Sequence, residues 1–276
     1  SGTSWRPRVA TPSRILVEAG CSATVSEPPP TRQNAPVTAE PGVTQPHLVV
    51  HDRGRDLAGV VHEGESWAAA ARRTVASLHV EPSPVDLSGE VKHFTVDHDT
   101  RVAVRAMGRG DLPDVTRWRQ SEHLHRWWAS DGDPTPERVT QLYGPSIDGM
   151  TPTRMWIAEV NGRSVGFVQD YRVGDYPEYA VLGPDPNAIG LDYALCEEWS
   201  GRGLGARVLW EWMLRARRRF PSATTFFAAP DHRNAASLRV LAKVGFTEGV
   251  WFDEPQQDGS VATVVGCTVD VRRVLG

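Results

Sequence analysis

Hydrophobic and polar positions form short regular patterns through most of the C-terminal two thirds of the chain. In TRVAVRAM (100–107) apolar and polar residues alternate, which predicts a strand. The segment 154–173 holds two strand-like runs joined by Asn161-Gly162, a pair typical of two-residue hairpin turns. The segments IGLDYALCEEW (189–199) and ATTFFAA (223–229) predict two further strands. We therefore expect a sheet with mainly antiparallel neighbours.

Segments with helical spacing of apolar residues separate these strands. Thr135 followed by Pro136 marks one helix start, because threonine can cap a helix and proline fits its first position. A second helix follows the turn GRGLG (201–205), and a third over 233–246 is ended by Gly245. This order predicts an α/β (α+β) fold in which a mixed, mostly antiparallel sheet is flanked by helices.

The N-terminal third has a different composition. Six prolines fall within residues 26–46, and because proline removes backbone donors we expect residues 1–46 to form a flexible, proline-rich arm. Residues 47–92 predict a small extension with a β-hairpin and a helix capped by Ser66. The main domain is then expected to span residues 93–276.

Charge and cysteine content narrow the class of protein. Thirty basic and thirty-four acidic residues give a net charge of −4, which argues against a broadly basic nucleic-acid-binding protein. No apolar run approaches the ~20 residues of a membrane span, so we expect a cytoplasmic protein that has no membrane partner. Cys21, Cys196 and Cys267 lie far apart, which favours neither a disulfide nor a cysteine metal site. No metal is expected.

The candidate chemistry begins where the strand 189–199 leads directly into a glycine-rich turn and a helix. The glycines of Ser200–Ala206 let the backbone approach a ligand, and the first N–H groups of the helix form an anion site suited to a pyrophosphate. The turn lacks the Lys-Ser/Thr pair of a P-loop and the spacing of a dinucleotide-binding loop. By itself it is equally consistent with a tight strand-to-helix connection.

The order of hairpin, glycine turn, Asn234-headed helix and terminal Gly-Phe resembles the GCN5-related N-acetyltransferase (GNAT) superfamily. This resemblance implies that the turn holds the pyrophosphate of acetyl-CoA and that the Asn-headed helix flanks the pantetheine. Two positions depart from the family: Ser200 replaces the usual Gln or Arg, and Leu241 replaces a tyrosine that often protonates the departing thiolate. The expected residues that bind acetyl-CoA are Leu195, Cys196, Gly201, Arg202, Gly203, Leu204, Gly205, Ala206 and Asn234.

Further segments resemble the aminoglycoside 6′-N-acetyltransferases: Asp185-Pro-Asn-Ala-Ile-Gly-Leu-Asp192, the Trp127-Trp128 pair and Tyr143-Gly-Pro-Ser146. The resemblance implies that Asp192 deprotonates the acceptor amine and that Asp185 holds it. A backbone N–H near Leu195 or Cys196 would stabilise the oxyanion. The family often has an acidic residue where this chain has Ala229.

Residues 170–200 carry seven acidic side chains and a single basic one, Arg172. This pattern fits either a solvated acidic loop or a lip that attracts a cationic acceptor. Trp128 fits core packing as well as a wall for the acceptor. The candidate substrate-binding residues are Trp128, Asp170, Asp185 and Asp192.

The expected function is acetyl-CoA-dependent N-acetylation of an amine on a cationic small molecule, with the 6′-amine of aminoglycoside antibiotics, and hence antibiotic resistance, as the first choice. One alternative is acylation of a lysine or hydroxylamine siderophore precursor, because Asp231-His-Arg-Asn234 is similar to that family. A second alternative is a non-catalytic module that binds acyl-CoA and uses residues 1–92 for interaction. We interpret Cys196 as a packed residue rather than a nucleophile, because no residue that could orient it is predicted nearby.

Overall fold

The main sheet has seven strands in the order β10-β11-β9-β8-β7-β6-β5 in the computed structural model, which describes residues 47–176, 185–256 and 258–276. The predicted arm at 1–46 lies outside the described residues. All neighbouring strands are antiparallel except β8 and β9. The strands are β5 (Val102–Ala106), β6 (Arg154–Val160), β7 (Arg163–Arg172), β8 (Ile189–Leu195), β9 (Thr225–Ala228), β10 (Thr247–Pro255) and β11 (Val261–Asp270). The expectation of a mixed, mostly antiparallel sheet with flanking helices is confirmed.

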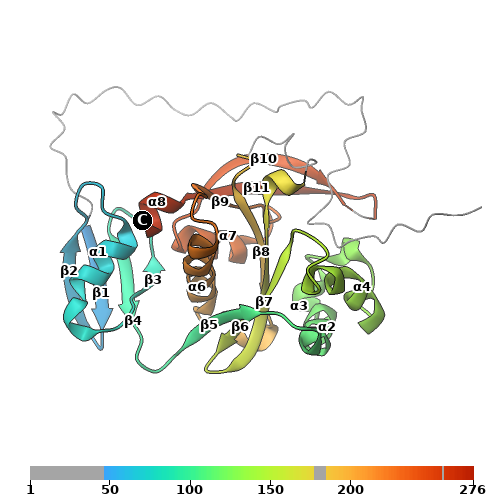
Figure 1. Ribbon diagram of the computed structural model, residues 1–276, viewed down its shortest axis with the longest axis horizontal. Helices are drawn as coiled ribbons and strands as arrows, with labels where there is room; N and C mark the ends of the chain where they lie inside the picture. The colour runs from blue at the N-terminus through green and yellow to red at the C-terminus, as the bar shows by residue number, and fades with distance from the viewer. Residues whose placement is uncertain (1–46, 177–184, 257) are drawn as a thin grey trace, which may run out of the picture.

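Helices cover both faces of this sheet, and each face has its own apolar core (Figure 1). On one face, α2 (Leu112–Gln120), α3 (Glu122–His125) and α4 (Pro136–Ile147) pack over Ile157 and Phe167. On the other face lie α6 (Leu204–Arg219), α7 (Ala235–Lys243) and α8 (Val271–Leu275). Side chains of successive residues in a strand therefore point into different cores.

Local sequence signals account for most element boundaries. Asn161 and Gly162 have φ angles of 50° and 77°, as the predicted two-residue turn between β6 and β7 requires. The Thr135 side chain accepts a hydrogen bond from the N–H of Arg138 at the start of α4. The strand predicted over 189–199 ends earlier, at Leu195, because Glu197–Trp199 form a 3₁₀ turn before the glycine segment.

The N-terminal extension forms a second, four-stranded sheet in the order β2-β1-β4-β3. It consists of β1 (His47–Asp52), β2 (Arg55–Val60), α1 (Trp67–Thr74), β3 (Ser83–Asp86) and β4 (Lys92–Val96). Because β4 pairs in parallel with β1, this sheet continues to Val96, beyond the boundary expected at residue 92. Strand β3 contains Pro84 and pairs with β4 in the antiparallel direction.

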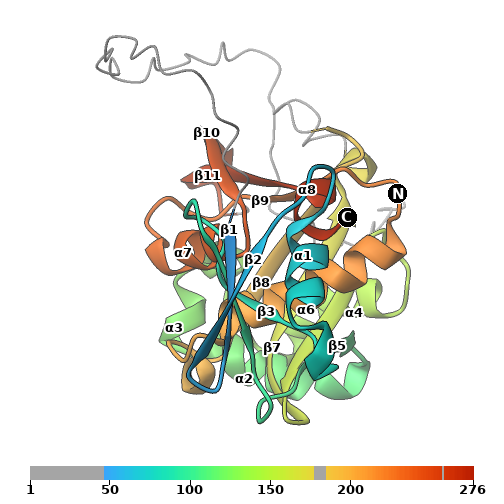
Figure 2. The same cartoon turned by 90° about the vertical axis from the view of Figure 1, so that its left-hand side faces the viewer.

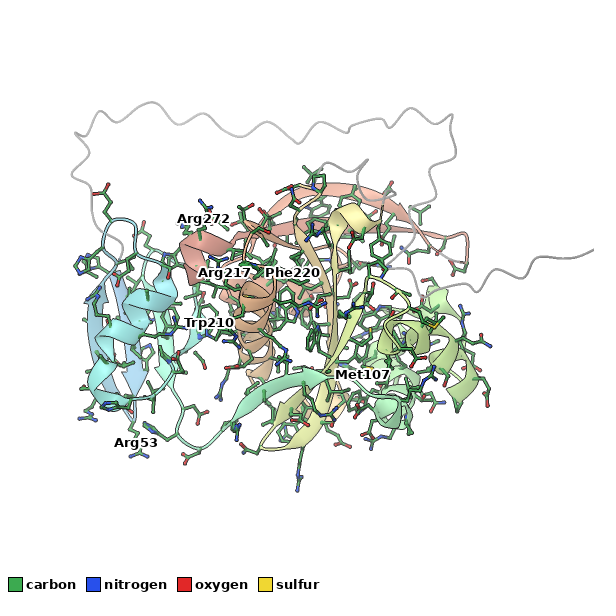
Figure 3. The ribbon with its side chains drawn as sticks, in the orientation of Figure 1. Arg53, Met107, Trp210, Arg217, Phe220 and Arg272 are labelled. Carbon is green, nitrogen blue, oxygen red and sulfur yellow. The ribbon has the colours of Figure 1, made fainter. Side chains whose placement is uncertain are left out.

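The extension shares a core with the main domain. In Figure 2 its strands lie in front of α6, and in Figure 3 Trp210 points from α6 towards it. The Trp210 ring meets Phe94 of β4 edge-on, with 5.8 Å between centroids, and Arg207 pairs with Asp97. Both aromatic side chains are almost completely buried, so the extension covers a face of α6 that would otherwise be exposed and apolar.

Among the helices of the described residues, none is long and apolar enough to cross a membrane.

Candidate active site

Strands β8 and β9 run parallel, but their pairing is short. Only Ile189 with Phe226 and Gly190 with Phe227 are partners, whereas β8 continues to Leu195 paired with β7. The two strands part after Gly190. Beyond Gly190, the edge of β8 that faces β9 therefore has no described strand paired with it, and its backbone groups face the gap between the two strands.

The two expected oxyanion donors differ in which way they point. The N–H of Cys196 donates to the carbonyl of Val165 at 2.8 Å, so it is already used and is not available to an oxyanion. Because residues in an antiparallel ladder alternate between bonding their partner strand and pointing away from it, the N–H of Leu195 points to the gap. Cys196 itself is buried, and burial raises the pKa of its thiol, which disfavours a nucleophilic thiolate.

An open pocket lies at this gap. The residues that carry its chemistry come from the loop after α3, from both faces of β8, from the start of α7 and from the terminal hairpin: Trp128, Asp192, Tyr193, Asn234, Ser237 and Glu254. The structure thus brings together three residues that were predicted from separate segments, namely Trp128, Asp192 and Asn234. Trp127 lines the pocket as well.

Asp192 is half-buried at the centre of this lining. Its Oδ2 accepts a hydrogen bond of 2.7 Å from Nε2 of Gln169, the residue opposite it on β7. Burial raises the pKa of Asp192, the negative charge of Asp131 raises it further, and the hydrogen bond from Gln169 opposes the rise. A carboxyl group with a raised pKa is a better proton acceptor once ionised, as a general base requires.

Tyr193 follows Asp192 and points to the other face, yet it lines the same pocket because the pocket runs through the gap. Its hydroxyl lies 2.9 Å from Ser237 Oγ, in the first turn of α7, and burial raises its pKa. Asn234 caps α7 by accepting from the N–H of Ser237 at 3.1 Å. Leu241 is 1% exposed and belongs to the core, so its role here is packing.

The glycine turn has the geometry of an anion site. Gly201 and Gly203 have φ angles of 73° and 76°, a left-handed conformation that favours glycine. Helix α6 begins at Leu204, and no described side chain caps its first N–H groups. Gly205 serves packing as well, because a Cβ there would lie 2.9 Å from a methyl group of Val240 on α7.

The remaining members of the turn differ in exposure. Ala206 and Leu204 are buried, so only their backbone can face a ligand. Arg202 is exposed, and its guanidinium lies 5.2 Å from the ring centroid of Trp199. It is thus a cation beside the anion site, at the end of the 3₁₀ turn.

Asp170 does not belong to the acceptor site that the sequence suggested. Its Oδ2 accepts from the indole N–H groups of Trp156 at 2.6 Å and Trp212 at 3.0 Å, and the residue is 1% exposed. It neighbours Gln169 on β7 and therefore faces α6, on the opposite side from Asp192. Burial raises its pKa. Its role in the structure is to join two buried tryptophans.

Asp185 is exposed and lies outside the described lining of the pocket. Its Oδ1 accepts from the N–H of Asn187 at 2.9 Å, which fixes a turn before β8. The structure therefore does not bring Asp185 together with Asp192.

Sequence reasoning missed Glu254 near the end of β10, which is 5% exposed and lines the pocket. The side-chain N–H of Gln256 donates to Glu254 Oε2 at 3.1 Å, and the side-chain oxygen of Gln256 accepts from the Ser130 hydroxyl at 3.0 Å. The hairpin is thereby joined to the loop that carries the tryptophan pair. No local pattern marks Glu254, because its position depends on how the terminal hairpin folds back.

A second missed residue is Arg119, whose side chain is completely buried. It donates to the Tyr143 hydroxyl, to the carbonyl oxygen of Trp128 at 3.2 Å and to Asp131 at 3.0 Å. Burial raises the pKa of Tyr143 to about 12. Arg119 thus ties the loop carrying Trp128 to α2 and α4, which fixes one wall of the pocket.

Among the described residues, no three histidine, cysteine, aspartate or glutamate side chains are grouped closely enough to hold a metal ion.

The sheet is mixed, and its two parallel strands part beside a glycine turn and a helix N-terminus, which is the order of elements that the resemblance to the GNAT superfamily implies. Residues 108–253, more than half of the chain, match the model of the acetyltransferase (GNAT) domain family. The chain belongs to this family. It is an N-acetyltransferase, and its co-substrate is acetyl-CoA.

Individual relatives agree with this family. The chain is 26% identical over 171 residues to the type 1 aminoglycoside N(6′)-acetyltransferases of Klebsiella pneumoniae and Serratia marcescens, which covers 61% of this chain and 80% of theirs. A crystal structure of aminoglycoside acetyltransferase AAC(6′)-Ib with coenzyme A is similar, with a TM-score of 0.53 at 24% identity over 62% of this chain and 95% of that one. The same enzyme with ribostamycin and coenzyme A gives 0.52 at 25% identity, over 61% and 93%.

Proposed function

We propose that this protein acetylates an amine of a cationic small molecule, and that the 6′-amine of an aminoglycoside is its acceptor. The observation that carries the proposal is the lining of the pocket at the gap between β8 and β9. It combines the carboxylates of Asp192 and Glu254 with the indoles of Trp127 and Trp128. No lysine, arginine or histidine is found among the described residues that line it.

Such a lining suits a ligand that carries ammonium groups on sugar rings, because the ammonium groups can contact the carboxylates and the ring faces can contact the indoles. Carboxylates in a partly desolvated pocket attract ammonium groups more strongly than carboxylates in water, and indoles favour cations and sugar rings. Asp231 lines the same pocket, but Arg233 pairs with it at 2.6 Å and offsets its charge. The similarity to two aminoglycoside N(6′)-acetyltransferases supports the same choice of acceptor.

The proposed reaction assigns one task to each residue. Asp192 takes the proton of the acceptor ammonium, and the free amine then attacks the thioester carbonyl of acetyl-CoA. The N–H of Leu195 donates to the oxyanion that forms on the carbonyl oxygen. When the C–S bond breaks, the electron pair leaves with sulfur, which takes up the proton that the attacking nitrogen loses, and the new amide remains on the acceptor.

The coenzyme is proposed to lie along the open edge of β8. Its pyrophosphate accepts hydrogen bonds from the N–H groups of Gly203, Leu204, Gly205 and Ala206, where the helix dipole is also favourable. Gly201 shapes the turn, Arg202 adds a positive charge, and Asn234 flanks the pantetheine from the start of α7. The start of α6 at the glycine turn and the presence of Asn234 in the pocket lining support these assignments.

The test is acetyl-CoA-dependent thiol release with a panel of amines: kanamycin, lysine with its N-hydroxy derivative, and a simple monoamine. We expect kanamycin to have the highest kcat/KM and NMR of its product to locate the acetyl group on the 6′-nitrogen. A preference for the lysine compounds would favour siderophore precursors instead. Binding of acetyl-CoA without turnover of any amine would contradict the proposal and favour a binding module.

A further inference from the structure

Gln169 donates a hydrogen bond to the carboxylate of Asp192. It lies directly opposite Asp192 in the register of β7 and β8, so both side chains leave the sheet on the same face. Its Nε2 donates to Asp192 Oδ2 at 2.7 Å, the length of a hydrogen bond to a charged acceptor. The partner is held by backbone pairing rather than by a flexible loop.

We propose that Gln169 is a positioning residue for the acetyl transfer: its amide holds the Asp192 carboxylate in the ionised form and orients its second oxygen towards the acceptor. This inference rests on the proposed role of Asp192 as the base. It assigns the residue that keeps that base available at neutral pH. A hydrogen bond to only one oxygen leaves the other oxygen to receive the proton.

The charges around Asp192 explain why such a donor matters. From the helical side, Asp131 faces Asp192 with a like charge and Tyr143 with a neutral phenol. Glu254 and Asp231 line the same pocket, and Arg233 offsets the charge of Asp231. The buried cation on this side, Arg119, already pairs with Asp131.

Burial and the charge of Asp131 favour the protonated carboxyl, whereas the hydrogen bond from Gln169 lowers the pKa of Asp192. Loss of the amide should therefore raise that pKa. At neutral pH a larger fraction of Asp192 would be protonated and inactive as a base.

The test compares Gln169→Met, which keeps the length of the side chain but removes the donor, with Arg163→Gln, an exposed change at the start of the same strand. The ascending limb of kcat/KM against pH should move upward by about one unit in Gln169→Met, a loss of about 10-fold on the acid side and none on the plateau. Arg163→Gln should keep the wild-type profile. The Kd for acetyl-CoA should be unchanged in both variants.

Combination with Asp192→Asn separates this role from a structural one. If Gln169 acts through Asp192, Gln169→Met should cause no further loss of kcat in the Asp192→Asn background. A loss of equal size at every pH, or one that persists in that background, would overturn the proposal. If Gln169→Met does not fold, Gln169→Glu replaces it: two carboxyl groups at this distance must share a proton, so the limb should move further upward. An unmoved limb there overturns the proposal.

The outcomes also distinguish this inference from the one on which it rests. A wild-type rate in Asp192→Asn would show that Asp192 is not the base, and it would contradict the proposed mechanism. A slow Asp192→Asn together with a wild-type pH profile in Gln169→Met would leave the base in place and reject Gln169 alone.

Discussion

The two sides of strand β8 are built in different ways. On the coenzyme side, the candidate contacts come from one continuous turn, Gly201–Ala206, and from the cap of α7, and they are mostly backbone N–H groups. On the acceptor side, the contacts are side chains that come from distant segments: Trp128 before α4, Asp192 on β8 and Glu254 on β10. A backbone site needs a local conformation, whereas a side-chain site needs the whole topology to bring its members together.

This difference has a kinetic consequence. The coenzyme side is proposed to bind the pyrophosphate, which does not react, so damage there should appear as weaker binding of acetyl-CoA. The acceptor side contains Asp192, the proposed base, so damage there should appear in kcat or in the KM for the amine. Variants on the two sides should therefore differ in which constant they change: the Kd for acetyl-CoA on the coenzyme side, and kcat or the KM for the amine on the acceptor side.

The largest effect is expected from Asp192→Asn. Asparagine keeps the shape and can still accept from Gln169, but it cannot take a proton, so kcat should fall about 10²–10⁴-fold. The Kd for acetyl-CoA, measured by calorimetry, should stay at its wild-type value. If Asp192→Asn turns over kanamycin at the wild-type rate, Asp192 is not the base, and the proposed difference between the acceptor side and the coenzyme side is contradicted.

A matched pair at Gly203 tests the coenzyme side. Asn and Asp tolerate the left-handed conformation of this residue better than other side chains, and a Cβ there meets no atom within 4 Å. Gly203→Asp adds a negative charge beside the pyrophosphate, and we expect it to weaken acetyl-CoA binding about 10-fold relative to Gly203→Asn, as charges at helix N-termini allow. The KM for the amine should not differ between the two variants. Equal Kd values for acetyl-CoA would argue against pyrophosphate binding at this helix start.

Glu254→Gln returns to the acceptor side with a smaller effect. The change keeps the size of the side chain and removes one negative charge from the pocket wall. We expect the KM for an aminoglycoside to rise about 10-fold while kcat changes little, because a charge contact made equally in the ground state and the transition state affects binding alone. A monoamine acceptor should be less affected. A fall in kcat at constant KM would instead make Glu254 part of the proton transfer.

The local structure that carries the proposed coenzyme site could be predicted from the sequence, because each of its features depends on adjacent residues. The glycines, the helix start and the Asn234 cap are each readable from adjacent residues, and the structure has all three. The hairpin at Asn161-Gly162 was readable for the same reason. The end of β8 was not, because the 3₁₀ turn after it depends on packing of Trp199 against both cores.

Only some of the candidate residues on the acceptor side could be predicted from the sequence. Asp192 was found through a resemblance, whereas Asp170 was chosen because it lies in an acidic run. Charge density along the chain does not show which face of a strand a residue occupies. Asp170 is buried in the core on the opposite face, where it accepts hydrogen bonds from two indole N–H groups. Glu254 and Gln169 were missed, since a hairpin return and a cross-strand register bring them to the site.

Asp185 gives the smallest expected effect and defines the edge of the acceptor site. The family resemblance assigns it to the amine, but its carboxylate is exposed and accepts from the N–H of Asn187. Asparagine at this position can keep that turn, and a single exposed charge outside the pocket lining contributes little in water. We therefore expect Asp185→Asn to change the KM for an aminoglycoside by less than about 2-fold, far less than Glu254→Gln does. The measurement is the ratio of the two KM values at low ionic strength, where exposed charges act most strongly. A rise as large as that of Glu254→Gln would extend the acceptor site to the turn before β8, and the carboxylates that bind the amine would then come from a local segment after all.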